Sequence, residues 1–444
     1  MFKIHFGLLD KSGKEYIIIF LQRLRKSMGK KLLFITTRLF WPIDSGKKVA
    51  LYYYCQGLKE VYDFEIYIYS FLEAGQTSRM LKDKPYFIKD VRIAKKVNLI
   101  NQFKNIIYKT FFNHDFPIQC SLFYNKQNLN EIKMLCNEIQ PDVIIVDMVR
   151  LAPYFLAFQN LNAKKILYME DLLSERYKRQ LESSYKSSIA GQYRANLSTG
   201  FLKLIEIKSI KNLILKIEKS LMYSAELKYA NIYEKVIFVS SKEANKLNKY
   251  YSDKAIDIPL GINVKEFFNC KYQNLKENNI CFVGNMYVAA NIDTLKLIIT
   301  EVLPYIKSKY KFYIVGKVSE QLKKQYSEYA NIVFTGRIDN IYDIAGKCKL
   351  FLAPIAYGSG IKTKILEAMA MQMPVITNDV GAEGLDVENQ KHLIIENNTQ
   401  KIARIADYYL NNYAAALKIA ENAQQLVFER YDWEKIWKKF KFIV

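Results

Sequence analysis

The sequence predicts an α/β protein built from two Rossmann-like, doubly wound domains. Its 444 residues exceed what one hydrophobic core usually supports. Short apolar, β-branched runs alternate with longer charged stretches of helical periodicity. The alternation pauses at Ile258-Pro259-Leu260-Gly261, a turn-forming stretch, and then starts again. Two successive series of this kind predict two parallel sheets, each with space for a ligand at the carboxyl ends of its strands.

The predicted strands fall into two groups on either side of that connection. The first group is Leu32–Thr37, Phe64–Ser70, Val143–Asp147, Ile166–Met169 and Val236–Ser240. The second group is Ile280–Gly284, Phe312–Val315, Ile332–Thr335, Leu350–Ile355, Val375–Thr377 and Leu393–Ile395. We therefore expect a first domain over residues 30–257 and a second over residues 258–428.

The two ends of the chain carry separate segments. Residues 1–29 contain an apolar run, Tyr16–Leu21, followed by basic residues. This run is much shorter than the roughly 20 apolar residues needed to cross a bilayer, and it lacks the order of a signal peptide. It is a candidate interfacial helix. Residues 429–444 form an aromatic, basic segment that we expect to be a terminal helix.

The net charge of +22 is concentrated in the first half of the chain. Residues 1–260 carry 42 basic and 25 acidic side chains, whereas residues 261–444 carry 24 and 19. Such an excess favours an anionic partner, which is a membrane surface, a nucleic acid or a phosphorylated substrate, although simple solubility accounts for part of it. Residues 176–230 are basic and amphipathic, which suits either a helix packed on the domain or a helix facing a membrane.

Cysteine and histidine usage argues against disulfide and metal sites. The six cysteines are scattered without a C-x-x-C pair, and there are three histidines, of which we interpret His114 as structural. Buried thiols in a reducing, cytoplasmic compartment are the expected outcome. No Asp-x-Asp sequence occurs, so we expect no metal.

A glycine-rich turn, Pro354 to Gly360, is the strongest candidate for a binding site. It joins an apolar strand to a helix pattern, and a helix N-terminus attracts phosphate. Lys364 and Glu367 fall beside the buried stripe of that helix, where they suit a phosphate and sugar hydroxyls. The alternative is an ordinary turn followed by a Lys364–Glu367 surface pair.

Four landmarks in order resemble one enzyme family. They are Ile258 to Asn263, Cys281 to Met286, Val333 to Arg337, and the glycine-rich turn with Gly381 to Leu385 after it. Together they resemble the retaining glycosyltransferases of GT-B fold, group 1, also called glycosyltransferase family 4. The resemblance implies two domains facing a cleft, with the C-terminal helix crossing back to the first domain.

The resemblance also assigns roles to individual residues. The donor diphosphate is expected near Gly358, Ser359, Gly360 and Ile361, with Gly284 close by. Glu367 is expected to bind the nucleotide ribose. Arg337 and Lys364 are expected to stabilise the departing phosphate. In the first domain Gly46 is expected to approach the donor closely, with Lys47 or Lys48 as a charge; solvated lysines at a helix start are the alternative for these two.

Three departures from the family pattern matter. Ser359 stands where the first glutamate of Glu-x7-Glu is usual, which leaves the donor sugar open. The usual histidine after a middle strand is replaced by Glu170-Asp171; we expect Asp171 to orient or deprotonate the acceptor hydroxyl, or else to cap a helix. The sequence after Gly284 lacks the usual basic pair, which makes Arg337 the first-choice replacement.

The expected function is transfer of a sugar from a UDP- or GDP-linked donor to a hydroxyl of a lipid-linked glycan acceptor in bacterial surface-polysaccharide assembly. No cofactor is expected beyond the nucleotide sugar. The basic first domain is expected at the anionic inner face of the membrane. Two alternatives stay open: a non-catalytic nucleotide-sugar sensor or scaffold, suggested by Ser359, and a nucleic-acid binder, which lacks a recognisable reading motif.

Overall fold

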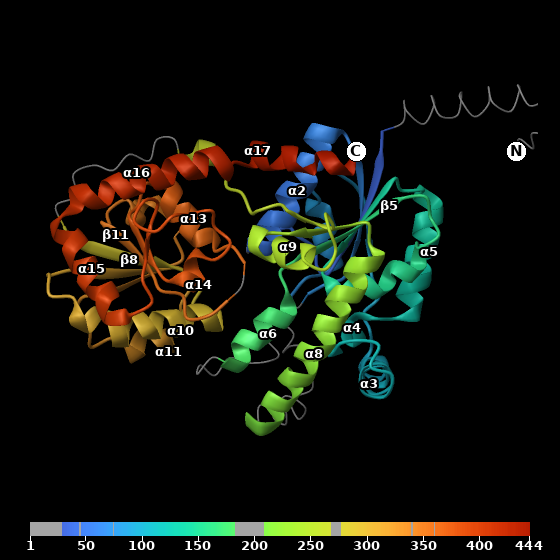
Figure 1. Ribbon diagram of the computed structural model, residues 1–444, viewed down its shortest axis with the longest axis horizontal. Coiled ribbons are helices and arrows are strands. Elements are labelled where there is room, and N and C mark those ends of the chain that lie inside the picture. The colour runs from blue at the N-terminus through green and yellow to red at the C-terminus, as the bar shows by residue number, and fades with distance from the viewer. Residues whose placement is uncertain are drawn as a thin grey trace, which may run out of the picture.

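The computed structural model describes residues 29–43, 46–73, 75–182, 208–267, 277–338, 341–358 and 360–444. It contains two α/β domains side by side, each with a central parallel sheet covered by helices (Figure 1). The predicted fold class is therefore confirmed. The expected interfacial helix near the N-terminus lies outside the described residues.

The first sheet has seven parallel strands in the order β3-β2-β1-β4-β5-β6-β7. Its strands are β1 (Lys31–Thr36), β2 (Glu65–Ser70), β3 (Ile88–Ile93), β4 (Val143–Asp147), β5 (Lys164–Glu170), β6 (Lys235–Phe238) and β7 (Ala255–Asp257). Its α-helices are α2 (Gly46–Tyr62), α3 (Leu99–Asn105), α4 (Ile118–Phe123), α5 (Lys126–Ile139), α6 (Leu173–Glu182), α8 (Lys208–Ile232) and α9 (Ser241–Asn248). Shorter helical turns are η1 (Ser78–Asp83), η2 (Ile106–Phe112), η3 (Val149–Ala157) and η5 (Val264–Phe267).

The second sheet has six strands in the order β10-β9-β8-β11-β12-β13. They are β8 (Asn279–Val283), β9 (Lys311–Val315), β10 (Ile332–Gly336), β11 (Leu350–Ala353), β12 (Val375–Thr377) and β13 (Ile394–Ile395). Its α-helices are α10 (Ala289–Leu297), α11 (Glu320–Gln325), α12 (Tyr342–Ala345), α13 (Thr363–Ala370), α14 (Asp379–Ala382), α15 (Thr399–Asn411), α16 (Tyr413–Arg430) and α17 (Trp433–Trp437). The turns η6 (Ile298–Val302), η7 (Leu303–Tyr305) and η8 (Lys438–Ile443) complete it.

Strand order locates the two crevices. The order reverses between β1 and β4 in the first sheet and between β8 and β11 in the second. Connections leave in opposite directions at such a switch point, so the carboxyl ends of the two strands are left open to a ligand. The segments after β1, β4, β8 and β11 are therefore where side chains reach substrates.

The two strands that the sequence pattern missed, β3 and β7, are the two edge strands of the first sheet. β3 reads Ile-Lys-Asp-Val-Arg-Ile and is buried at few positions, and β7 has three residues. An edge strand has one pairing neighbour and partial solvent exposure, so it tolerates charged residues that obscure a hydrophobic pattern.

The long basic segment 176–230 is split in the structure. Its ends form α6 and α8, while residues 183–207 lie outside the described part. On α8, Leu215, Met222 and Tyr229 are buried in the first domain. The described portion of α8 is thus a helix packed on the domain. No helix in the described parts of the chain is both long and apolar enough to cross a membrane.

The chain's last helix returns to the first domain, as expected (Figure 1). Trp433 of α17 stacks on Tyr53 of α2 with ring centroids 4.8 Å apart. Trp437 lies directly over Gly57 of α2, where an added Cβ would come within 2.2 Å of its indole ring. A glycine is required there because α2 and α17 approach too closely for any side chain.

We predict that Gly57→Ala destabilises the protein by about 1–3 kcal/mol, because overpacking forces Trp437 and α17 to move. Without that contact, alanine in a helix would stabilise by up to ~1 kcal/mol over glycine. Urea unfolding of Gly57→Ala, Trp437→Leu and the double variant measures the coupling. Strict additivity of the two changes would contradict the direct contact.

Candidate active site

The glycine-rich turn leads into α13, which begins at Thr363, slightly later than the sequence suggested. Gly358 and Gly360 have φ values of 149° and 68°, in the region that favours glycine. Ile361 is buried and packs against the backbone of Gly384. The turn therefore exposes its backbone to the cleft while Ile361 anchors it in the core.

Lys364 lies on the first turn of α13 and points under the loop that follows β8. Its ammonium donates to Asn291 Oδ1 at 2.5 Å and lies 4.8 Å from the centre of the Phe282 ring. A Cβ on Gly284 would come within 3.1 Å of the lysine nitrogen, so Gly284 makes room for it. Burial lowers the pKa of Lys364 to about 8. The ammonium is thus held where it is poorly solvated, and a bound anion would stabilise its charged form.

Lys362 is a second cation at the same helix start. Its nitrogen donates to the carbonyl oxygen of Gly360 at 2.5 Å. Burial lowers the pKa of Lys362 to about 8, in spite of the favourable charge of Glu383. Two lysines with depressed pKa values beside one helix N-terminus form a region of concentrated positive potential.

Glu367 lies one turn further along α13. Burial raises its pKa to about 7, although the charge of Lys364 opposes this rise. Within the described parts of the chain, no group donates a hydrogen bond to its carboxylate. A partly buried carboxylate without protein donors is costly unless a ligand supplies them, which suits a hydroxyl-bearing ligand.

The N-terminus of α2 meets the N-terminus of α13 across the cleft. An added Cβ on Gly46, at the start of α2, would lie 3.6 Å from the Thr363 methyl group at the start of α13. The positive ends of two helices therefore converge where the diphosphate is expected. The close approach of Gly46 to the donor stays a prediction.

Lys47 and Lys48 are not solvated, so the alternative of solvated lysines at a helix start is wrong. Lys47 forms ion pairs with Asp147 at 2.9 Å and Glu170 at 3.0 Å. Lys48 pairs with Glu73 at 2.9 Å, and both lysine side chains are almost fully buried. Their charge is balanced within the first domain.

Asp147 ends β4 at the first switch point and is fully buried. Burial opposes its ionisation, but Lys47 and the amide and hydroxyl of Thr37 outweigh this and lower its pKa. Asp147 is therefore a fixed anion that holds the Lys47 ammonium in place.

Glu170 ends β5 and carries the open carboxylate of this wall. Its φ of 69° is unusual for a residue other than glycine, and the β5–β6 register shifts there. Its side chain keeps 21% exposure while pairing with Lys47. Strain of this kind, of order 1–3 kcal/mol, is often retained where it aims a functional side chain.

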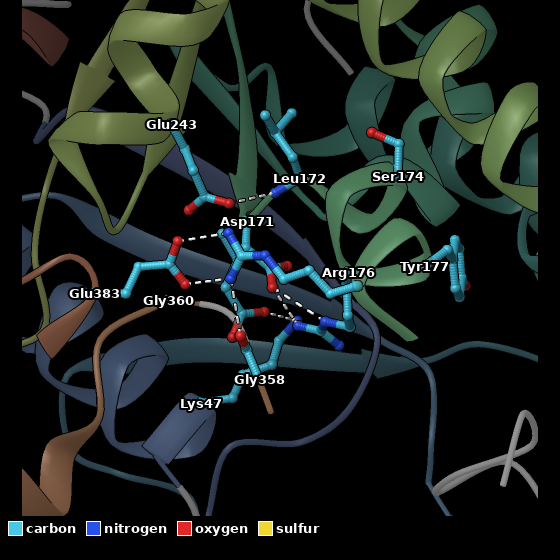
Figure 2. Close-up of polar contacts among 12 residues, drawn as sticks. Lys47, Asp171, Leu172, Ser174, Arg176, Tyr177, Glu243, Gly358, Gly360 and Glu383 are labelled. Carbon is cyan, nitrogen blue, oxygen red and sulfur yellow. Dashed lines mark hydrogen bonds and ion pairs between the residues drawn. The ribbon is translucent and has the colours of Figure 1, made fainter. Parts of the chain in front are cut away.

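Asp171, in contrast, is only 2% exposed and is paired with Arg176 (Figure 2). It does not cap α6, because the Leu172 and Ser174 amides donate to Glu243 and Glu226 at 3.0 Å each. The alternative of a helix cap is therefore wrong. Its catalytic role stays a prediction, and in this geometry the neighbouring Glu170 is the more accessible carboxylate.

An ion pair between Arg179 and Glu383 joins the two domains across the cleft (Figure 2). Arg179 of α6 donates to both carboxylate oxygens of Glu383, one of them at 2.6 Å, and to the carbonyl oxygen of Gly358 at 3.0 Å. The hydrogen bonds to Glu383 raise the pKa of Arg179. This bidentate bridge connects the first domain to both glycine segments of the second.

The remaining predicted site residues are not placed beside the start of α13. Arg337 follows β10 at the edge of the second sheet and is exposed. Its phosphate role stays a prediction, and Lys364 and Lys362 occupy the position beside α13. Ser359 lies outside the described residues.

Sequence reasoning missed the residues that act across long separations. Arg179 and Glu383 are 204 positions apart, and no local pattern links them. Asp147 and Glu170 carried a usable signal, since each is an acidic residue at the carboxyl end of an apolar strand. Lys362 was not chosen as a site residue from the sequence.

A cavity of about 690 Å³ lies elsewhere, lined by residues such as Val264, Gln372, Phe428 and Asp432. Gln372 follows the C-terminal end of α13, whereas the strand ends lie at its N-terminal end. The cavity is therefore separate from the cleft just described.

Part of the chain is similar in sequence to known proteins. Residues 277–412 match the family model of the glycosyl transferases group 1. An uncharacterized 44.6 kDa protein in the cps region of Klebsiella pneumoniae is 30% identical over 219 residues, covering 46% of this chain and 54% of that protein. The Escherichia coli O-antigen biosynthesis glycosyltransferase WbnH is 28% identical over 220 residues, covering 43% of this chain and 61% of that protein.

The fold is shared more widely than the sequence. Anabaena Alr3699/HepE, solved in complex with UDP and glucose, superposes with a TM-score of 0.61 at 12% identity, covering 93% of this chain and 98% of that chain. This likeness identifies the fold as GT-B. Residues 277–412 thus resemble the glycosyl transferases group 1, and the chain spans about half to two thirds of the length of the curated relatives it matches.

We predict that nucleoside diphosphate affinity falls as pH rises through about 8, because Lys364 and Lys362 lose their protons there. Lys364→Met should lower affinity about tenfold and make the pH profile shallower, since Lys362 remains. Titration calorimetry with UDP and GDP measures both effects. Exposed Lys391→Met is the matched control, and an unchanged profile in Lys364→Met would refute the assignment.

We also predict that Glu383→Arg loosens the interdomain contact, because it places two cations together. Hydrogen exchange should then rise in the segment 354–366, whose backbone Arg179 holds. Restoring the pair in reverse, Arg179→Glu with Glu383→Arg, should recover part of the protection. Arg92→Glu, an exposed pair within the first domain, is the control. Equal exchange in all variants would show that the bridge does not fix this segment.

Proposed function

We propose that this protein is a glycosyltransferase that moves a sugar from a nucleoside diphosphate to an acceptor hydroxyl. The observation that carries the proposal is the group at the start of α13: Lys362, Lys364 and the Glu367 carboxylate, which accepts no hydrogen bond from the described residues. Cations with depressed pKa values suit a diphosphate, and Glu367 suits the ribose hydroxyls. The UDP bound by HepE makes UDP the first donor base to test, with GDP the second.

In the proposed reaction, the bond between the anomeric carbon and the diphosphate oxygen breaks, and a bond to the acceptor oxygen forms. Negative charge grows on the departing phosphate. Lys364 and the helix N-termini of α2 and α13 stabilise that charge through fixed dipoles and a poorly solvated ammonium. We propose that this stabilisation needs no metal, so a chelator should leave the rate unchanged.

On the acceptor side we propose Glu170 as the carboxylate that binds the incoming hydroxyl. It is partly exposed, and its strained backbone fixes its direction. Gly360 lies close to Val239, whose amide donates to the carbonyl oxygen of Glu170 at 3.0 Å, so the Glu170 backbone borders the donor turn. The ion pair with Lys47, at 3.0 Å, orients the Glu170 carboxylate.

The finer properties follow the family resemblance. We propose retention of the anomeric configuration, membership of glycosyltransferase family 4, and a cytoplasmic enzyme working at the inner membrane face. The relatives named for O-antigen biosynthesis and the cps region support a glycan acceptor, which we propose to be lipid-linked. The alternative function, a sensor or scaffold, rests on Ser359, which stands where the family usually has a sugar-contacting glutamate.

The test is transfer or hydrolysis from a panel of UDP- and GDP-sugars by the purified full chain. We expect turnover with at least one donor. Glu367→Ala should lower nucleotide affinity about tenfold, since it loses a charge-assisted hydrogen bond. Glu170→Gln should keep nucleotide affinity and reduce transfer at least about a hundredfold.

Other outcomes separate the alternatives. Nucleotide binding without turnover across the panel would favour the sensor. Transfer lost in Asp171→Asn but kept in Glu170→Gln would restore Asp171 as the acceptor-side carboxylate. Unchanged nucleotide affinity in Glu367→Ala would refute the ribose assignment.

A further inference from the structure

Helix α3 and its continuation η2, residues Leu99–Phe112, are oriented against the usual rule for a surface helix. The polar side chains of Asn105 and Thr110 face the protein. Asn105 donates to the carbonyl oxygens of Ser121 and Tyr124 at 3.0 and 2.8 Å, and Thr110 bonds the Ser121 hydroxyl at 2.9 Å. Thr110 is the one buried residue in these fourteen positions.

Most apolar side chains of the same segment are exposed, and Ile106 and Ile107 are half-buried. The exposed ones are Leu99, Ile100, Phe103, Tyr108, Phe111 and Phe112, which we call the 99–112 surface. Phe103 is 60% exposed and Phe112 is 72% exposed. The three exposed phenylalanines in the described parts of the chain all belong to this surface.

Such an arrangement is unfavourable in water. A surface helix normally buries its apolar stripe and exposes its polar one. Contiguous exposed apolar side chains mark a place that contacts something else, whereas single ones carry no such meaning. In the second domain the exposed aromatic residues, Tyr287, Tyr305, Tyr329 and Tyr408, lie on separate elements.

The charges around the surface indicate what it contacts. Residues 94–126 contain five lysines and one acidic residue, Asp115. Lys96, Lys104 and Lys126 are exposed, and Lys95 keeps more than half of its side chain exposed beside Glu131. Aromatic and aliphatic groups flanked by lysines match the boundary between lipid headgroups and acyl chains.

We propose that the 99–112 surface docks this protein on an anionic lipid bilayer, with the outward aromatic side chains entering the headgroup region. A second copy of the chain fits less well, because a symmetric contact would bring Lys96 and Lys104 close to their own copies. Single-stranded nucleic acid fits less well too, because Leu99 and Ile100 offer no ring for base stacking.

The proposal extends the proposed use of a lipid-linked acceptor by naming the surface that reaches the membrane. The role of membrane docking rests on the proposed function. The docking itself is tested separately, because vesicle binding is measured without any sugar transfer. Figure 1 shows α3 beside α4 at the outer edge of the first domain. Docking there leaves the interdomain bridge and the strand ends untouched.

The test is co-sedimentation of the full chain with phosphatidylcholine vesicles, with and without phosphatidylglycerol. We expect binding to the anionic vesicles, weakened by salt. Phe103→Ser with Phe112→Ser should lower vesicle affinity at least about tenfold. Lys96→Glu with Lys104→Glu should lower it similarly and reduce its salt dependence. Tyr329→Ser with Tyr408→Ser and Lys309→Glu are the matched controls on the second domain.

A tryptophan reporter tests the contact directly. Trp41, Trp433 and Trp437 are all buried, so Phe103→Trp adds a single exposed indole. Brominated lipid should quench that indole more strongly than the three native ones. Circular dichroism and nucleotide affinity of each variant show whether the fold and the cleft are intact.

Several outcomes would overturn the proposal. Vesicle binding that survives both double variants would place the membrane contact elsewhere, such as the first 28 residues. Equal binding to neutral vesicles would remove the role of the lysines. Loss of self-association in the phenylalanine variant, without lipid, would identify a second copy as the partner. Tighter binding to an oligonucleotide than to vesicles, lost in the same variants, would identify nucleic acid.

Discussion

The packing of α17 on α2 sets the geometry on which the site depends. Each sheet alone has a crevice at its switch point, but a crevice on one domain binds only part of a two-substrate reaction. Trp433 and Trp437 fix the second domain to α2, and α2 is also the helix whose first residue, Gly46, meets Thr363. One helix thus links the rear contact between the domains to the facing helix ends in the cleft.

Charge is distributed unequally across that cleft. The first domain presents carboxylates at its strand ends, Asp147 and Glu170, with Lys47 between them. The second domain presents Lys362 and Lys364 at a helix start. Arg179 and Glu383 are the reverse case, with the cation on the first domain and the carboxylate on the second, and their ion pair joins the two domains. A diphosphate would neutralise the lysines, so ligand binding and domain contact act on neighbouring charges.

Much of the fold followed from the sequence because its interior strands are nearly all apolar. β4 and β12 have the predicted bounds, and the interior strands differ by a few residues, because such strands are buried on both faces. The edge strands β3 and β7 were missed for the opposite reason. In the candidate site, Lys364 and Glu367 could be proposed because strand, turn and helix are contiguous in sequence, whereas Gly284 came from the family resemblance. Arg179 and Glu383 could not be, since their contact exists only after two domains have packed.

The positive charge of the first half of the chain belongs to its outer surface more than to its cleft. Lys47 and Lys48, which the sequence offered as phosphate ligands, are neutralised by Asp147, Glu170 and Glu73. Lys96, Lys104 and Lys126 remain exposed beside an apolar helix face. A buried cleft lysine whose pKa lies near 8 can pair directly with a bound phosphate. Solvated lysines are instead attracted at longer range to an anionic surface. The two sets therefore do different work, and they differ in how salt and pH should affect them.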